Sequence, residues 1–382
     1  MKICFICPEY PEGPHGGIGS MVRILSRELV KKGNEVRVVG IYPVSYPAPD
    51  YEEDQGVKVW RLRTRKGKFG WVIPYMKQYR MIKDWVFNGD AEIVEAPDSR
   101  GWFAFWPGLP VPLVLRANGA NTYFARVLGT SVNRLTRILE TRSYRRANAF
   151  ISVSEFTSGL TREVFGLSKP FEVIYNGIEI PDIRSGCPRE KNKVVFSGSL
   201  NRKKGIFQLV EGFRLLLGKH PGLIMEIYGK DSVDPEFGSV RAYLENSIEK
   251  EYRNSIRFKG HVSRTELFSV YETATVAVFP SFAEAFAFAP MEAMACECPT
   301  IYTKLGSGPE AIDHGKDGLL IDPDKPAEIA SAIKTLIEDP TLAAAMGMNG
   351  RAKIRRSFSQ EIMVERSYEF YKNTIRKFKN EK

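Results

Sequence analysis

Short apolar runs alternate with segments of helical periodicity along most of the chain. The run at 2–7 predicts a buried strand, and residues 20–32 place apolar side chains at helical spacing before Gly33, which suits a helix end. Further strands are predicted at 35–40, 91–95, 112–116, 149–153 and 173–175. Strands separated by helices form parallel sheets covered by helices, so the pattern predicts an α/β fold.

A second series of the same kind follows a segment rich in proline, glycine and mixed charges. It predicts a helix at 207–217 and strands at 193–196, 223–228, 255–258, 276–279 and 300–302. We therefore expect two Rossmann-like doubly wound domains facing across a cleft, because 382 residues exceed one ordinary domain. The expected boundaries are 1–178 for the first domain, 179–192 for a linker, 193–358 for the second domain and 359–382 for a last helix.

Composition narrows the class of protein. Hydrophobic residues make up 43% and charged residues 26%, the balance of a globular protein. Cys4 and Cys7 lie in the first apolar run, and the chain has only four histidines, so buried strand cysteines are favoured over a zinc site. The apolar run at the start of the chain is too short for the apolar region of a signal peptide. No apolar run reaches the length that a membrane-spanning helix needs. We expect a soluble, cytoplasmic protein.

The net charge of +10 is concentrated in two clusters. The first comprises Lys58, Arg61, Arg63, Arg65, Lys66 and Lys68, followed by Phe69 and Trp71; the second, on a predicted helix, comprises Arg134, Arg137, Arg142, Arg145 and Arg146. Solvated surface charge explains both. The alternative is contact with a phosphorylated acceptor or with anionic lipid headgroups, which would place the protein peripherally at the inner face of the membrane. No recognisable nucleic-acid-binding motif accompanies the charge, which disfavours nucleic acid.

Two loops after predicted strands carry candidate phosphate contacts. Gly16 and Gly17 precede the first predicted helix, where the backbone can approach an anion closely. Their spacing is not G-x-G-x-x-G, which disfavours a dehydrogenase. The loop after the first strand of the second domain contains Ser199, Arg202 and Lys204. A cationic loop at the carboxyl end of a parallel sheet suits a phosphate, although an exposed basic loop has the same composition.

The most specific pattern is at 280–295. Glu284 and Glu292 stand eight positions apart around a loop of small residues, and Pro290 suits the first position of a helix. The free amides of Phe288 and Ala289 would then face an anion. Glu292, one turn into that helix, could accept hydrogen bonds from vicinal hydroxyls, and Glu284 could do the same for a second sugar. Core packing explains the apolar residues but does not require the two acids.

These residues resemble a known family. Glu284-x7-Glu292 is followed by Gly306-Ser307-Gly308-Pro309-Glu310 and Gly315-Lys316-Asp317-Gly318. In that order, the pattern resembles the retaining nucleotide-sugar glycosyltransferases of family four, which have the glycosyltransferase B fold. The resemblance extends over nearly the whole chain and includes the N-terminal glycine pair, Asn176-Gly177-Ile178 and Lys204-Gly205. It implies that the last helix crosses back to pack on the first domain.

The resemblance also implies roles for individual residues. Glu292 would bind the donor ribose, Glu284 the donor sugar, and Lys204 the diphosphate, where it would stabilise the departing charge. The full set of implied donor-binding positions is Gly16, Gly17, Ser199, Arg202, Lys204, Glu284, Phe286, Ala287, Phe288 and Glu292. The donor would be a UDP- or GDP-sugar, and the acceptor, docked on the first domain, a lipid-linked or surface glycan. Neither a cofactor nor a metal ion is implied.

This chain departs from the family pattern at three places. Asn118 stands where the family has a histidine near the reacting carbon; an asparagine cannot take up a proton near neutral pH, which fits a leaving phosphate that accepts the proton itself. Ser199 replaces an arginine, for which Arg202 or Lys203 could substitute. Alanine replaces glycine at 285 and 287, so these positions are not expected to need a positive φ. A catalytically silent homologue acting as an assembly partner, or an epimerase of similar architecture, remains an alternative.

Overall fold

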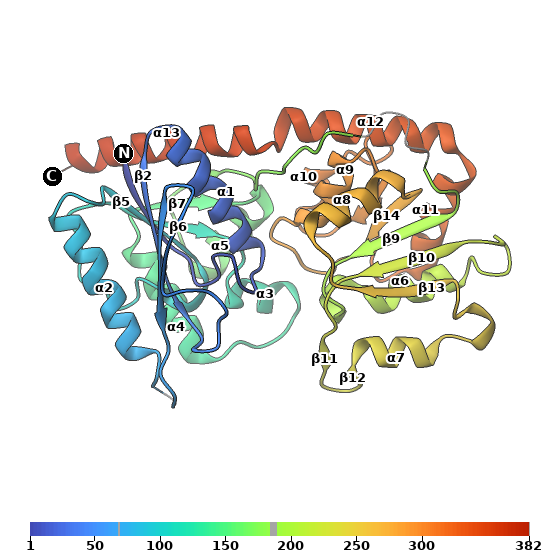
Figure 1. Ribbon diagram of the computed structural model, residues 1–382, viewed down its shortest axis with the longest axis horizontal. Coiled ribbons are helices and arrows are strands. Elements are labelled where there is room, and N and C mark those ends of the chain that lie inside the picture. Colours follow the sequence, from blue (N-terminus) through green and yellow to red (C-terminus); the bar gives the residue numbers. More distant parts are fainter. Residues whose placement is uncertain (68, 184–188, 382) are drawn as a thin grey trace. The chain divides into compact units, whose positions relative to one another are not determined.

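The computed structural model describes residues 1–67, 69–183 and 189–381, which form two compact units (Figure 1). Unit 1 comprises Met1–Gly177 and Gln360–Lys382, and unit 2 comprises Ile178–Ser359. The segment 179–192, expected as a linker, lies within unit 2, and its residues 184–188 fall outside the described residues. Arg189 in this segment donates to the carbonyl oxygens of Ala274 at 2.8 Å and Glu297 at 2.6 Å, so the described part of the segment is fastened to unit 2.

Unit 1 is built on an eight-stranded sheet in the order β3-β4-β2-β1-β5-β6-β7-β8, in which only β3 is antiparallel to its neighbour. The strands are β1 (Lys2–Ile6), β2 (Glu35–Tyr42), β3 (Tyr51–Asp54), β4 (Val57–Arg63), β5 (Ile93–Pro97), β6 (Leu113–Ala117), β7 (Ala149–Ser152) and β8 (Glu172–Val173). The chain moves outward from β1 in one direction and then returns to β5 on its other side. Strand order therefore reverses between β1 and β5, where doubly wound proteins bind ligands.

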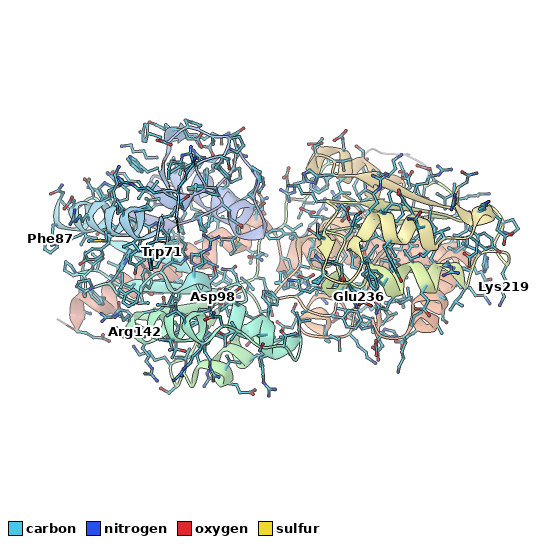
Figure 2. All side chains as sticks on the ribbon, turned by 90° about the horizontal axis from the view of Figure 1, so that it is seen from below. Trp71, Phe87, Asp98, Arg142, Lys219 and Glu236 are labelled. Carbon is cyan, nitrogen blue, oxygen red and sulfur yellow. The ribbon has the colours of Figure 1, made fainter. Side chains whose placement is uncertain are left out.

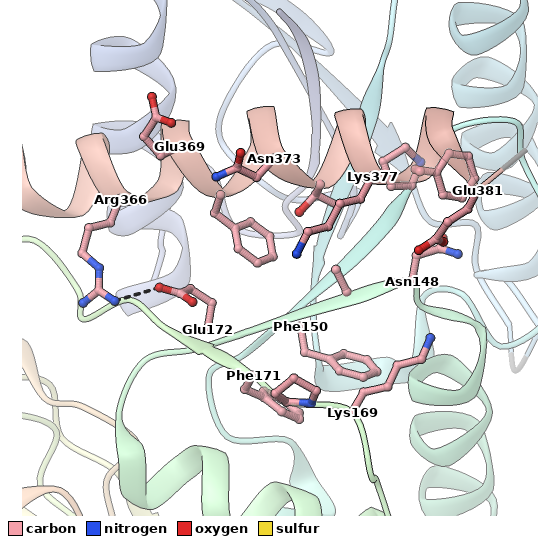
Figure 3. Close-up of a pocket in the computed structure, with 16 residues that line it drawn as sticks. Asn148, Phe150, Lys169, Phe171, Glu172, Arg366, Glu369, Asn373, Lys377 and Glu381 are labelled. Carbon is pink, nitrogen blue, oxygen red and sulfur yellow. Dashed lines mark hydrogen bonds and ion pairs between the residues drawn. The ribbon is translucent and has the colours of Figure 1, made fainter.

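Helices cover both faces of this sheet (Figure 1). They are α1 (Gly17–Lys31), α2 (Val72–Phe87), α3 (Asn121–Val127), α4 (Arg134–Arg146), α5 (Glu155–Phe165) and α13 (Gln360–Asn380). Alternate side chains of β1 point to opposite faces: Ile6 packs in one core cluster with Ile82 of α2, while the ring of Phe5 lies 6.2 Å from that of Tyr371 in α13. At the sheet edge, Arg366 of α13 pairs with Glu172 of β8 at 2.8 Å (Figure 3).

Unit 2 contains a six-stranded parallel sheet in the order β13-β10-β9-β14-β15-β16. Its strands are β9 (Lys193–Ser197), β10 (Ile224–Tyr228), β13 (Ile256–Gly260), β14 (Val276–Phe279), β15 (Thr300–Thr303) and β16 (Leu319–Ile321), beside a small hairpin of β11 (Val233–Asp234) and β12 (Gly238–Ser239). This is the strand order of a Rossmann fold, with the reversal between β9 and β14. The prediction of two doubly wound α/β domains is confirmed.

The helices of unit 2 bury the faces of this sheet. They are α6 (Ile206–Arg214), α7 (Val240–Ser247), α8 (Arg264–Thr273), α9 (Phe288–Ala295), α10 (Gly308–Ala311), α11 (Pro326–Glu338) and α12 (Pro340–Ser357). Apolar residues at helical spacing in α6 and α11, among them Phe213, Ile329 and Ile333, join β-branched residues of the strands in one core. The rigid sheet formed in this way holds the loops that follow β9 and β14.

Two helices begin at residues other than those predicted from the sequence. Helix α1 begins at Gly17 rather than at residue 20, so part of the glycine pair lies inside the helix. Helix α9 begins at Phe288, which makes Pro290 its third residue rather than its first. Proline is tolerated throughout the first turn because those amides have no partner within the helix. The amides of Phe288 and Ala289 therefore remain at the helix start, as expected from the sequence.

The first basic cluster is not simply solvated charge. Strand β3 lies antiparallel to β4 and, with the loop before it, supplies acids for the basic strand: Arg61 pairs with Glu52, and Arg63 pairs with Asp50 at 2.6 Å. Arg61 is only 1% exposed, so the surface interpretation is wrong for this residue. Lys68 lies outside the described residues.

Two other expectations bear on the environment of the protein. Cys4 and Cys7 are buried and free, and burial raises the pKa of the Cys4 thiol to about 12, as expected for core cysteines. No helix in the described ranges combines the length and the hydropathy needed to cross a bilayer.

Candidate functional site

The loop after β9 is shaped by a glycine that no other residue could replace without a shift. Gly205 has φ +69°, and a Cβ there would lie 1.9 Å from the carbonyl oxygen of Pro280, at the end of β14. One turn earlier, the Asn201 side chain accepts a hydrogen bond from the Lys204 amide at 3.1 Å. The loops that follow β9 and β14 are therefore in close contact at the carboxyl edge of the sheet, at the point where strand order reverses.

Lys204 and Glu284 form an ion pair across these two loops. The Lys204 side chain is 25% exposed and that of Glu284 10%, so the pair is partly shielded from water. The Phe282 amide donates to the Lys203 carbonyl oxygen at 2.8 Å and fixes the two loops in register. Two candidates that lie 80 positions apart in the sequence are thus brought together by the adjacency of β9 and β14.

Glu292 has a partner that sequence reasoning missed. On α9 its carboxylate accepts a hydrogen bond from Nε of Arg264 at 2.8 Å, and Arg264 also pairs with Glu179 at 3.0 Å. Glu292 is 8% exposed; burial raises its pKa, and the Arg264 guanidinium opposes that shift. Nη2 of Arg264 is buried with no hydrogen-bond partner in the described part of the chain. A ligand oxygen arriving beside Glu292 would therefore find a donor as well as an acceptor.

The start of α9 is open to an anion. Ala287 precedes the helix with φ −81° and ψ 141°, and no side chain caps the first turn. The negative φ of Ala287 confirms that alanine fits where the family has glycine. Phe286 is buried, with its ring 5.4 Å from that of Phe358, so its side chain positions the loop by packing. The amides of Phe288 and Ala289 are left as donors at a helix N-terminus.

Arg202 is held by acids rather than left free. Its guanidinium donates to both oxygens of Asp234, at 2.7 and 3.2 Å, and to Glu236 at 2.6 Å, and it lies 4.8 Å from the ring of Phe237. Lys203 has a different environment: burial lowers the pKa of its ammonium group, Glu284 opposes that shift and Lys204 adds to it. Ser199 is exposed in the same loop.

In unit 1 the predicted anion position at the glycine pair already holds a carboxylate. Gly16 precedes α1 and Gly17 is its first residue. The side chain of Glu9 accepts a hydrogen bond from the Gly19 amide at 2.9 Å, and a Cβ at Gly16 would lie 3.2 Å from the same carboxylate. Sequence reasoning missed Glu9. A ligand phosphate at the start of α1 would therefore lie beside the Glu9 carboxylate and compete with it for the amide hydrogens.

Asn118 is held from both sides after β6. Its amide N–H donates to Asp98 at 3.1 Å, and its side-chain nitrogen donates to the Arg116 carbonyl oxygen at 3.1 Å. Asp98 follows β5, is 1% exposed and also accepts a hydrogen bond from the Tyr144 hydroxyl at 3.2 Å. Burial raises the pKa of Asp98 to about 7, and the nearby Glu140 carboxylate adds to the effect. Asp98 thus fixes the backbone at Asn118.

Replacing Asp98 by asparagine is expected to alter how the stability of unit 1 depends on pH. The pKa of Asp98 rises on folding from 3.8 to about 7, so the folded state retains a proton that the unfolded state loses. Its contribution therefore falls between pH 4 and pH 7, by about 4 kcal/mol. Relative to Asp98→Asn, the wild-type free energy of unfolding should decline over this range in urea titrations followed by tryptophan fluorescence. Parallel pH profiles would contradict the assignment.

Two family models match successive parts of this chain. The family model described as Glycosyltransferase Family 4 matches residues 15–180, and the model described as Glycosyl transferases group 1 matches residues 181–353. Glycogen synthase of Mycobacterium tuberculosis is 24% identical over 406 residues, covering 97% of this chain and 94% of its own length.

Two solved structures share the fold along nearly the full chain. Sucrose-phosphate synthase of Thermosynechococcus elongatus has a TM-score of 0.79 at 19% identity, covering 97% of this chain and 98% of its own. HepE of Anabaena, crystallised with UDP and glucose, has a TM-score of 0.75 at 16% identity, covering 98% and 100%. The two family models meet at residues 180 and 181 and both describe sugar-transferring enzymes, so the chain belongs to the family-four glycosyltransferases, with the glycosyltransferase B fold.

Proposed function

We propose that this protein transfers a sugar, with retention of configuration, from a nucleotide diphosphate donor to a hydroxyl of a glycan or lipid-linked acceptor. The observation that carries the proposal is the Lys204–Glu284 ion pair at the reversal point of the unit 2 sheet. A cation there suits a diphosphate, and an acid beside it suits sugar hydroxyls. Because HepE was crystallised with UDP and glucose, UDP-sugars are the first donors to test, followed by GDP-sugars.

The remaining roles follow from the contacts around this pair. Glu292 would accept hydrogen bonds from the ribose hydroxyls, with Arg264 keeping its carboxylate in place. The open amides at the start of α9 would join Lys204 on the diphosphate. We assign the part of the missing family arginine to Lys203 rather than Arg202, because two acids already match the charge of Arg202.

The chemistry needs no proton acceptor on the protein. A bond forms between the acceptor oxygen and the anomeric carbon, while the bond from that carbon to the phosphate oxygen breaks and its electron pair leaves with the nucleoside diphosphate. The acceptor proton passes to the leaving phosphate. Lys204 and the α9 amides would stabilise the developing negative charge. Asn118 can orient hydroxyls but cannot take the proton.

We assign charge neutralisation to lysines and helix amides rather than to a metal ion. Over the ranges that the structure describes, no three His, Cys, Asp or Glu side chains are grouped as a metal site would require. Turnover of UDP-, GDP- and ADP-sugars, measured with and without EDTA, tests both parts of the proposal. Saturable nucleotide binding without turnover would identify a silent homologue, and an altered sugar nucleotide formed without acceptor would identify an epimerase.

The outer face of α2 suits an anionic membrane as partner. Ile73, Met76 and Phe87 are 50%, 48% and 65% exposed, and the cations Lys77, Arg80 and Lys83 lie between them. Just before the helix, Phe69 is 70% and Trp71 44% exposed. Figure 2 labels Trp71 and Phe87. The opposite face of α2 packs in the core through Ile82 and Val86. This face also carries one exposed acid, Asp84, and its apolar and mainly cationic side chains are typical of helices that lie in a membrane interface.

Neutralising two of these cations is expected to weaken membrane binding. Lys77→Gln/Arg80→Gln should bind phosphatidylglycerol vesicles about 30-fold more weakly than wild type, because each cation contributes about 1 kcal/mol. Co-sedimentation at low and high salt measures the effect, and Lys219→Gln, an exposed site on unit 2, is the control. Binding that ignores the anionic lipid content would rule out this partner.

A further inference from the structure

A hollow of about 550 Å³ opens in unit 1 beside α3 and the first turns of α4. The residues that give it its chemical character are Arg126, Thr130, Ser131, Arg134, Arg137 and Glu163. Three arginines thus face one glutamate. The groove beneath α13, about 740 Å³ in volume (Figure 3), instead carries cations and acids in equal number. Of these two hollows, the one beside α3 is lined by an excess of cations.

The arginines of α4 divide into two groups. Arg142 and Arg146 donate to the carbonyl oxygens of Ala104 and Trp106, so they serve the fold. Arg134 and Arg137 are exposed in the hollow, and among residues 1–67, 69–183 and 189–381 neither forms an ion pair. Two guanidinium groups without a carboxylate offer forked donors that match a phosphate.

A third arginine lies close to them with its charge already engaged. Arg126 of α3 pairs with Glu163 of α5 at 3.1 Å, and both side chains are more than 60% exposed. An exposed pair of this kind is weak and can exchange for a phosphate at little cost. The hydroxyls of Thr130 and Ser131 add neutral donors in the loop between the two helices.

The hollow lies beside the helix that follows the candidate site residue Asn118 in the chain. Helix α3 begins at Asn121, three residues after Asn118, and Arg126 lies little more than one turn into it. The start of α3 itself is not the anion site, because the Glu140 carboxylate already accepts hydrogen bonds from the amides of Asn121 and Thr122, each at 3.1 Å. The arginines that line the hollow, rather than the amides at the start of α3, are therefore the donors open to an anion here.

We infer that this hollow binds a phosphate group carried by the acceptor, with Arg134 and Arg137 as its main contacts. The inference rests on the proposed function, since it gives a chemical class to the acceptor. The acceptor hydroxyl would lie toward Asn118, and its phosphate in the hollow beside α3. A soluble sugar phosphate and a lipid-linked phosphate share this chemistry.

The test uses the full chain and inorganic phosphate as the probe. Phosphate, added at constant ionic strength, should shift the ¹⁵N amide resonances of Thr130 and Ser131. Arg134→Gln/Arg137→Gln should weaken this binding by roughly tenfold or more, because each lost contact is a charge-assisted hydrogen bond. Arg145→Gln, exposed on the same helix outside the hollow, is the matched control and should bind phosphate as wild type does.

Two further measurements separate the alternatives. Phosphatidylglycerol vesicles distinguish a bilayer from a discrete phosphate: if the double variant loses vesicle binding but keeps the phosphate shifts, the arginines serve a membrane and the inference is overturned. UDP binding is measured on the same samples. Phosphate shifts without any UDP binding would support this site while refuting the proposed function; an absence of shifts at Thr130 and Ser131 would refute the site alone.

Discussion

Lys204→Ala is expected to lower kcat by roughly 10²–10³-fold with the best nucleotide-sugar donor, the usual loss for one preorganised electrostatic contact to the transition state. The Asn201 side chain and the glycine turn at Gly205 fix the Lys204 backbone at the carboxyl edge of the unit 2 sheet, and the ion pair with Glu284 holds the ammonium group. It is thus in place before negative charge develops on the leaving diphosphate. KM for the donor should change less than kcat, because that charge grows in the transition state.

A double-mutant cycle distinguishes this role from simple neutralisation of Glu284. If Lys204 only compensates the partly buried carboxylate of Glu284, removing the lysine in a Glu284→Gln background should cost nothing. If it holds the diphosphate, Lys204→Ala/Glu284→Gln should turn over far more slowly than Glu284→Gln. Initial rates measure both, with Lys219→Ala as an exposed control in the same unit. Equal rates for Glu284→Gln with and without the lysine substitution would refute the diphosphate role.

Local patterns in the sequence predicted most strands and the candidate acids, whereas only the family resemblance implied that Lys204 and Glu284 serve one donor. Lys204 and Glu284 were each found from a local pattern. Their contact depends on β14 returning to lie beside β9, a sheet order that alternating runs do not encode. Hydropathy and its periodicity are local properties of a chain, whereas strand adjacency depends on how the elements pack together.

The contact residues that the sequence analysis missed had weaker sequence signals, although some of these signals can be recognised. Ser263 and Glu266 form a capping box at the start of α8, which places Arg264 at the first turn of a helix. Gln55 and Gly56 both have positive φ, a two-residue hairpin turn between β3 and β4. That turn brings Glu52 opposite the basic strand. Glu9 had no comparable signal, because its role depends on how a proline-rich loop folds back onto α1.

A buried ion pair fastens the last helix to the sheet of unit 1. Arg116 on β6 donates to Glu95 on β5 at 2.7 Å, and the Tyr371 hydroxyl of α13 donates to the same carboxylate at 2.6 Å. Arg116, Glu95 and Tyr371 are 1%, 2% and 0% exposed. Because Arg116 also supplies the carbonyl that holds the Asn118 side chain, the pair supports the backbone of the candidate site as well as the fold.

Arg116→Met is expected to lower the free energy of unfolding of unit 1 by about 3–5 kcal/mol, because it leaves the Glu95 carboxylate buried without its cation. All five tryptophans lie in residues 60–106, so urea titrations followed by tryptophan fluorescence report on unit 1 alone. Arg116→Met/Glu95→Gln should recover most of the loss, since a neutral amide can still accept from Tyr371. The exposed Arg162→Met should stay within about 0.5 kcal/mol of wild type. If Arg116→Met were as stable as that control, or the double variant no more stable than Arg116→Met, an uncompensated charge at Glu95 would not be the cause.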